Sequence, residues 1–167
     1  EGVESAACLA ARAMSLPSAT ANTISGIEAL GDRPWVRPGG ELGWLDVGAG
    51  TGCLTKVACE CWGFTNCTAI DYGGASSGSK DTAQGIFHNA LRSVTGGTRG
   101  MCMRVDQYDG WTLPFANASF DVVSFSFVLH HVGSTRAQRR LLDEARRVSR
   151  RHVVLGEDTI ENAADFN

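Results

Sequence analysis

Several features that would assign a chain to a membrane or secreted class are missing from these 167 residues. No stretch approaches the roughly 18 consecutive apolar residues that a transmembrane helix needs, so we expect no membrane span. The N-terminus has no basic region followed by an apolar core, and it therefore shows no secretory signal. The chain begins at Glu1 rather than at a methionine, which indicates either a removed presequence or a fragment.

The cysteines also lack a metal-binding pattern. None of the six belongs to a CxxC pair, and no histidine follows them at zinc-finger spacing. Cys59, Cys61 and Cys67 are close enough in sequence to bind a soft metal, and this is the alternative. We favour small buried thiols in a reducing compartment, either the cytoplasm or an organelle interior, and expect no metal.

An excess of one charge is missing too. The net charge of −3 gives no general reason to expect nucleic acid or an anionic membrane as a partner. The segment 135–151 is an exception in composition, because it carries seven arginines against Asp143 and Glu144. Such a run is usually the solvated face of a helix, and the alternative is a surface that docks on RNA or on an acidic protein. The arginines are Arg136, Arg139, Arg140, Arg146, Arg147, Arg150 and Arg151.

The sequence does contain strand and helix patterns in alternation. We expect strands at 42–47, 66–72, 101–106, 120–128 and 152–158, and helices at 53–63, 81–95 and 135–149. This alternation predicts an α/β domain with a doubly wound, mainly parallel, Rossmann-like sheet and helices on both faces.

The rest of the chain is expected to flank or interrupt this domain. Residues 1–41 are predicted to form two helical segments, 3–15 and 19–30, and a loop at 31–41 that is rich in proline and glycine. Residues 73–80 form a turn-rich insert. The α/β domain itself is expected to span residues 42–167.

A cluster of glycines follows the first expected strand in the stretch LDVGAGTG. Gly48, Gly50 and Gly52 therefore lie beyond the carboxyl end of a strand, where open α/β sheets bind their ligands. A Walker phosphate loop is excluded, because no Gly-Lys-Ser/Thr sequence follows these glycines. The GxGxxG pattern of NAD-binding loops would require glycine at position 53, where Cys53 stands.

Two carboxylates indicate the kind of ligand. Asp46 lies two residues before the first glycine, where its charge would repel a pyrophosphate and favour an ammonium or a sulfonium group. Asp71 ends the second expected strand, a position at which an acidic residue can accept both hydroxyls of a ribose. A helix N-cap is the alternative for Asp71. These residues favour a cationic, adenosine-containing ligand.

The motifs LDVGAGTG, AIDY, LPF…ASFDVVSFSFVLHHV and LLDEARRVSRRHVVLGED, taken in this order, resemble those of class I S-adenosylmethionine-dependent methyltransferases. The similarity covers about residues 42–158 and is greatest to the branch that acts largely on small molecules. It implies a Rossmann-like fold and transfer of a methyl group from S-adenosylmethionine to a small-molecule acceptor. It also implies that the last two strands of the family's sheet are missing.

The resemblance further implies a cofactor site. The glycine loop, with Ala49, would pass under the methionine part of S-adenosylmethionine, and Asp46 would reach its ammonium group. Asp71 would hold the ribose, and Tyr72 would lie beside the adenine.

An acidic residue after the third strand usually lies near the adenine in this family. Its position is open between two alternatives. Counting back from Leu113 indicates Asp109, whereas continuity of the strand indicates Asp106 with Gln107. We prefer Asp106.

The candidate bases for removing a proton from the acceptor are His130 and His131, after the fourth strand. A histidine has a suitable pKa for this task at neutral pH. Packing of the doubled histidine is the alternative. Glu157 and Asp158, after the fifth strand, are weaker candidates.

The absence of the family's last strands would leave strand 152–158 as an exposed edge. A second hypothesis follows: a methyltransferase-like domain that serves as a structural or assembly subunit, whose protein partner covers this edge. Binding of S-adenosylmethionine separates this hypothesis from the enzyme.

Overall fold

A computed structural model describes residues 8–9, 18–29, 41–50, 52–72 and 104–157 of the chain. The insert predicted at 73–80 and the helix predicted at 81–95 lie outside the described residues. So do all but the last residue of the loop predicted at 31–41 and most of the helix predicted at 3–15, of which Cys8 and Leu9 are described and helical.

The described strands form one five-stranded sheet in the order β3-β2-β1-β4-β5, and every neighbouring pair is parallel. The strands are β1 (Gly43–Val47), β2 (Asn66–Tyr72), β3 (Arg104–Tyr108), β4 (Phe120–Ser126) and β5 (Ser149–Gly156). The strand order reverses on either side of β1, so a topological switch point lies at its carboxyl end. This arrangement confirms the predicted doubly wound, Rossmann-like α/β fold.

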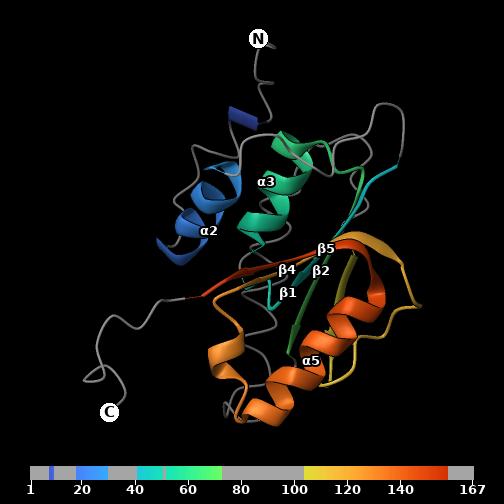
Figure 1. Cartoon of the computed structure of the whole chain (residues 1–167). Helices are drawn as coiled ribbons and strands as arrows, with labels where there is room; N and C mark the ends of the chain where they lie inside the picture. Colours follow the sequence, from blue (N-terminus) through green and yellow to red (C-terminus); the bar gives the residue numbers. More distant parts are fainter. Residues whose placement is uncertain (1–7, 10–17, 30–40, 51, 73–103, 158–167) are drawn as a thin grey trace.

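Helices cover both faces of the sheet (Figure 1). Helices α2 (Ser18–Ala29) and α3 (Cys53–Trp62) pack on one face, in a core that includes Trp44, Trp62 and Val122. Helix α5 (Thr135–Val148) packs on the other face, in a core that includes Leu45, Phe125 and Leu141. Alternating side chains of the buried central strands therefore supply two apolar cores, as helices on both sides of a sheet require.

Several strand boundaries differ from the expected ones, and three of the differences bear on the site. β3 ends at Tyr108, two residues later than predicted. β4 ends at Ser126 because Phe127 has a φ of 56°, a left-handed conformation that cannot continue a strand. β5 begins at Ser149, directly after α5, so no separate loop connects the helix to the strand.

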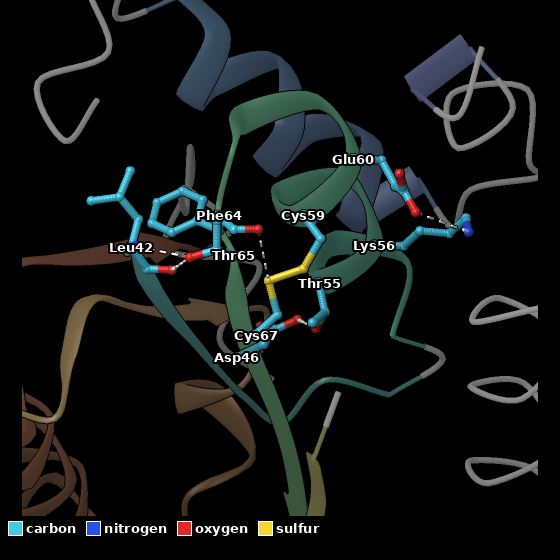
Figure 2. The surroundings of a disulfide bond; sticks show 9 residues. All are labelled: Leu42, Asp46, Thr55, Lys56, Cys59, Glu60, Phe64, Thr65 and Cys67. Carbon is cyan, nitrogen blue, oxygen red and sulfur yellow. Dashed lines mark hydrogen bonds and ion pairs between the residues drawn. A yellow bond between two sulfur atoms is a disulfide. The ribbon is translucent and has the colours of Figure 1, made fainter. Parts of the chain in front are cut away.

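The prediction of reduced, separate thiols is wrong for four cysteines in this structure. Cys59 of α3 faces Cys67 of β2 and forms a disulfide with it (Figure 2). Cys61 forms a second disulfide with Cys8. Packing of a helix face on a neighbouring strand brings these residues together, and sequence spacing alone does not show it. Cys53 is buried and is not part of either disulfide.

The arginine-rich helix α5 holds a preceding loop. The Arg147 guanidinium donates to the carbonyls of Leu113 and Phe115 at 2.9 and 2.7 Å, and it pairs with Glu144 at 2.7 Å. Glu144 in turn accepts the Leu113 amide at 3.0 Å. Part of the arginine run is therefore structural, and docking on RNA or protein remains a prediction.

β5 is the outermost described strand next to β4. Val153 and Leu155 on this strand are 36% and 50% exposed. Two apolar side chains of this outer strand are therefore exposed in the described part of the chain. Separately, none of the helices in the described part of the chain is both long and apolar enough to cross a bilayer.

Candidate functional site

The glycine loop joins β1 to α3 at the switch point of the sheet. Gly48, Gly50 and Gly52 have φ values of 71°, 52° and 76°, a region that favours glycine. The amides of Gly48 and Ala49 donate to the carbonyl of Ile70 at 2.8 and 3.1 Å, which fixes the loop to the end of β2.

The first two glycines of the loop serve different purposes. A Cβ on Gly48 would lie 2.4 Å from a methyl group of Val128, so glycine is required there for close packing against the end of β4. A Cβ on Gly50 would meet nothing within 4 Å. The backbone at Gly50 is therefore open to the approach of another molecule.

Asp46 lies beneath this loop and is only 1% exposed. Thr55 Oγ1 donates to its Oδ2 at 2.7 Å, and Ser124 Oγ donates to its Oδ1 at 2.9 Å. Burial raises the pKa of Asp46 to about 6; the negative charge of Asp71 also raises it, and the hydrogen bonds from Thr55 and Ser124 oppose the increase. The structure thus places Asp46 under the loop, tied to α3 and β4, rather than on an open surface.

Asp71 lies on the other side of the loop, near the end of β2. Its Oδ2 accepts the amide of Gly50 at 2.8 Å, and its side chain is partly exposed. The structure therefore brings Asp71 to the open glycine of the loop. Tyr72 is the last residue of β2. The helix that Asp71 would cap lies outside the described residues.

The end of β3 changes the choice between the two acidic alternatives. Asp106 and Gln107 lie within the strand, in register with Ile70 and Asp71, whereas Asp109 is the first residue after it. The amides of Trp111 and Thr112 donate to Asp109 Oδ1 at 2.8 and 2.7 Å. These backbone hydrogen bonds lower the pKa of Asp109. The criterion was that the acidic residue directly follows the third strand. Because β3 ends at Tyr108 and not at 106, this criterion now favours Asp109.

Negative charge accumulates around Tyr108 at this edge of the sheet. Burial and, to a smaller extent, the negative charges of Asp71 and Asp109 together raise the pKa of Tyr108 to about 12. The carboxyl ends of β2 and β3 thus present a negative field beside the open glycine loop. Such a field disfavours a pyrophosphate and favours a ligand with a positive charge.

The doubled histidine lies at the end of the neighbouring strand β4, in a short 3-10 turn, Leu129–His131. His130 Nδ1 lies 2.8 Å from Glu157 Oε2, and the His130 and His131 rings are 3.9 Å apart between centroids. Glu157 Oε1 also accepts the amides of Val128 and Leu129. Burial acts to raise the pKa of Glu157, but the hydrogen bonds from His130 and the two amides outweigh it, so the pKa is lowered.

Sequence reasoning missed Thr55, Ser124 and Phe127. Ser124 is a fully buried hydroxyl in an apolar strand, and a serine within VVSFSF was the available signal. Nothing in the sequence indicated the left-handed conformation of Phe127, which is uncommon for a non-glycine residue. Backbone strain of this kind often occurs at functional sites.

The described residues contain no cluster of three or more His, Cys, Asp or Glu side chains that could hold a metal ion. The carboxylates at this edge instead accept hydrogen bonds from amides and a histidine.

Comparisons with solved structures show the same fold in methyltransferases. CalS10, a SAM-bound amino pentose methyltransferase from Micromonospora echinaspora involved in calicheamicin biosynthesis, matches with a TM-score of 0.55 and 18% identity, over 96% of this chain and 60% of that one. A SAM-dependent methyltransferase from Aquifex aeolicus matches with a TM-score of 0.54 and 16% identity, over 85% of this chain and 66% of that one.

Phosphoethanolamine N-methyltransferase 1 of Haemonchus contortus, in complex with phosphoethanolamine and S-adenosylhomocysteine, has a TM-score of 0.54 and 16% identity. The match covers 80% of this chain and 23% of that one. The chain thus spans less than two thirds of each of these structures. No curated protein sequence matches the chain significantly.

The family comparison covers most of the sheet. The model of the methyltransferase domain matches residues 45–155, from the start of the glycine-loop motif to the penultimate residue of β5. The chain therefore belongs to the methyltransferase-domain family, as its resemblance to the class I S-adenosylmethionine-dependent enzymes predicts.

Proposed function

We propose that the chain binds S-adenosylmethionine at the carboxyl ends of β1, β2 and β3 and transfers its methyl group to a small-molecule acceptor. The observation that carries this proposal is the pairing of an open glycine backbone at Gly50 with the carboxylates of Asp71 and Asp109. When bound, S-adenosylmethionine supplies a methyl group that its sulfonium already activates.

The residues present fit this group. The negative field around Tyr108 suits a ligand that carries an ammonium and a sulfonium. Carboxylate oxygens are acceptors only, so Asp71 can receive ribose hydroxyls while the loop amide of Gly50 lies beside it. Asp109 lies at the end of β3, where the resemblance places the adenine.

Asp46 takes a different role in this proposal from the one that the resemblance implies. Both of its oxygens accept hydrogen bonds, from Thr55 and Ser124, and its side chain is buried beneath the loop. We therefore assign Asp46 to positioning the loop between α3 and β4. The ammonium group of the cofactor would meet the backbone of the loop above it.

The acceptor would lie on the β4 and β5 side of the cofactor. His130 is exposed there and its ring contacts Glu157. A small-molecule acceptor is supported by the structures similar to this chain, because CalS10 is an amino pentose methyltransferase and the Haemonchus enzyme was solved with phosphoethanolamine.

Calorimetric titration of the chain with S-adenosylmethionine tests the proposal. We expect saturable binding by the wild type and none by Asp71→Ala. Asp143→Ala is the control, because Asp143 is an exposed carboxylate on α5, away from the sheet's carboxyl end. A well-folded wild-type chain that does not bind S-adenosylmethionine would contradict the proposal.

That outcome would favour the scaffold hypothesis. The exposed side chains of Val153 and Leu155 on β5 support this second candidate function. It predicts association with a protein that covers β5, in a chain whose glycine loop no longer binds the cofactor.

A further inference from the structure

The ends of β4 and β5 are joined by a histidine and a carboxylate that the cofactor site does not use. His130 follows β4, Glu157 follows β5, and Nδ1 of His130 lies 2.8 Å from Oε2 of Glu157. The His130 side chain is 47% exposed and that of Glu157 is 25% exposed. The histidine is therefore accessible to a substrate, while its partner is more enclosed.

We propose that Glu157 is a positioning residue that fixes the tautomer of His130, so that His130 Nε2 is free to accept a proton from the methyl acceptor. This inference rests on the proposed function. A carboxylate can only accept hydrogen bonds, so the short contact requires the proton of neutral His130 to be on Nδ1. The lone pair is then on Nε2, at the ring edge away from Glu157.

The backbone holds Glu157 in this position. Its Oε1 accepts the amides of Val128 at 2.9 Å and Leu129 at 2.7 Å, which leaves Oε2 directed to the imidazole. The left-handed backbone of Phe127 turns the chain immediately before these amides, and the Phe127 amide donates to the Gly156 carbonyl at 2.7 Å. The same strained turn thus fixes both members of the pair.

This arrangement distinguishes the two histidines. His130 contacts the carboxylate through Nδ1, whereas the ring of His131 packs against the ring of His130 in a tilted arrangement, with an angle of 51° between the planes. A base that a carboxylate orients is the general pattern for proton transfer by histidine. The structure therefore favours His130 as the base and His131 as a packing residue.

The proton step balances without any further reactant. As a lone pair of the acceptor forms its bond to the methyl carbon, the carbon–sulfur bond breaks and its electron pair stays on sulfur. The acceptor's proton passes to His130 Nε2. The imidazolium that forms keeps its Nδ1 proton on the Glu157 carboxylate, which stabilises the positive charge.

Glu157→Gln separates positioning from folding. Its carbonyl oxygen must accept the amides of Val128 and Leu129, because an NH₂ group cannot. The NH₂ group then faces His130 Nδ1 and forces the proton to Nε2. The variant therefore keeps the hydrogen bonds to the amides of Val128 and Leu129, while the tautomer of His130 is reversed.

Long-range proton–nitrogen correlation spectra of the ¹⁵N-histidine-labelled full chain, at a pH where the rings are neutral, test the inference. We expect the Nδ1–H tautomer for His130 in the wild type and the Nε2–H tautomer in Glu157→Gln. The signals of His152 serve as an internal reference, and Asp143→Asn is the matched control. An Nε2–H tautomer in the wild type, or no change in Glu157→Gln, would overturn the inference.

Methyl transfer gives an independent readout. With an acceptor on which the wild type is active, Glu157→Gln should lower kcat by about 10²- to 10⁴-fold, the range that a positioned general base contributes, with the affinity for S-adenosylmethionine unchanged. An unchanged kcat would overturn the inference. A well-folded wild type that does not bind S-adenosylmethionine would overturn the proposed function, and the two tautomers would still confirm or overturn the positioning by Glu157.

Discussion

At the amino end of the sheet Asp121 is 4% exposed and lies 3.4 and 3.5 Å from Arg150 and Arg151. It also accepts the amide of Gly43, at the start of β1, at 2.9 Å. At the carboxyl end Asp71 is partly exposed and accepts the amide of a glycine loop. The first carboxylate links β4 to β5 through ion pairs and to β1 through a hydrogen bond, and the second lies beside an open backbone.

The difference shows how one fold separates stability from binding. Asp121 is the second residue of β4, and these contacts give it a structural role. At the amino end, the carboxylate oxygens of Asp121 accept hydrogen bonds and ion pairs from groups of the chain itself. At the carboxyl end the field around Tyr108 is negative, and the loop backbone at Gly50 is accessible. Variants at the amino end should therefore change unfolding, and variants at the carboxyl end should change ligand affinity.

Gly48→Ala should have the largest effect, because it disturbs the packing on which the carboxyl end depends. Its Cβ would lie 2.4 Å from Val128, and the φ of 71° is unfavourable for alanine. We expect the free energy of unfolding to fall by about 4 kcal/mol, measured by urea denaturation. The matched variant Gly50→Ala has open space and should lose only about 1 kcal/mol. Equal losses in the two variants would contradict the packing role of Gly48.

Asp46 should make the stability depend on pH. Its pKa is about 6 in the folded chain against an ordinary 3.8, so between these values the folded state holds a proton that the unfolded state has lost. The contribution of Asp46 to stability is therefore present below about pH 4 and is lost as the pH rises to about 6, by up to about 3 kcal/mol.

Asp46→Asn removes this contribution. The free energy of unfolding of the variant minus that of the wild type should increase from pH 4 to pH 7, and chemical denaturation at several pH values measures it. A difference that is constant with pH would contradict the buried position of Asp46. The affinity for S-adenosylmethionine should change less than in any Asp71 variant.

Arg147→Met tests the amino end of the sheet, since Arg147 lies just before the start of β5. It removes hydrogen bonds to the carbonyls of Leu113 and Phe115 and the pairing with Glu144. We expect a loss of about 2 kcal/mol in the free energy of unfolding and no change in S-adenosylmethionine affinity of the folded protein. Arg146→Met is the control, since Arg146 is exposed on the same helix. Weaker cofactor binding by folded Arg147→Met would contradict the proposal that the amino end of the sheet affects stability and not ligand affinity.

Sequence patterns predicted the order and type of the described elements well, because apolar strands bounded by glycine turns have a clear signature. They also predicted that Gly48, Gly50 and Asp71 would meet at one edge of the sheet. The end of β3 could not be predicted, because the polar residues Asp106 and Gln107 continue the strand. The sequence alone therefore leaves the choice between Asp106 and Asp109 open.

Other features depend on contacts between distant segments. The pairing of Cys59 with Cys67 requires α3 to pack on β2, and Thr55 of α3 contacts Asp46 of β1 (Figure 2). Ser124 of β4 donates to the same carboxylate. The contact between His130 and Glu157 joins residues that are 27 positions apart. Local pattern carries no information about such contacts.

The same chemical change at the two ends of the sheet tests the account most directly. Asp71→Asn and Asp121→Asn each replace a carboxylate by an amide of equal size, and calorimetric titration with S-adenosylmethionine compares their affinities with that of the wild type. We expect Asp71→Asn to bind at least about tenfold more weakly, and Asp121→Asn to bind as the wild type does while unfolding at lower urea. Equal affinities of Asp71→Asn and the wild type would contradict the account.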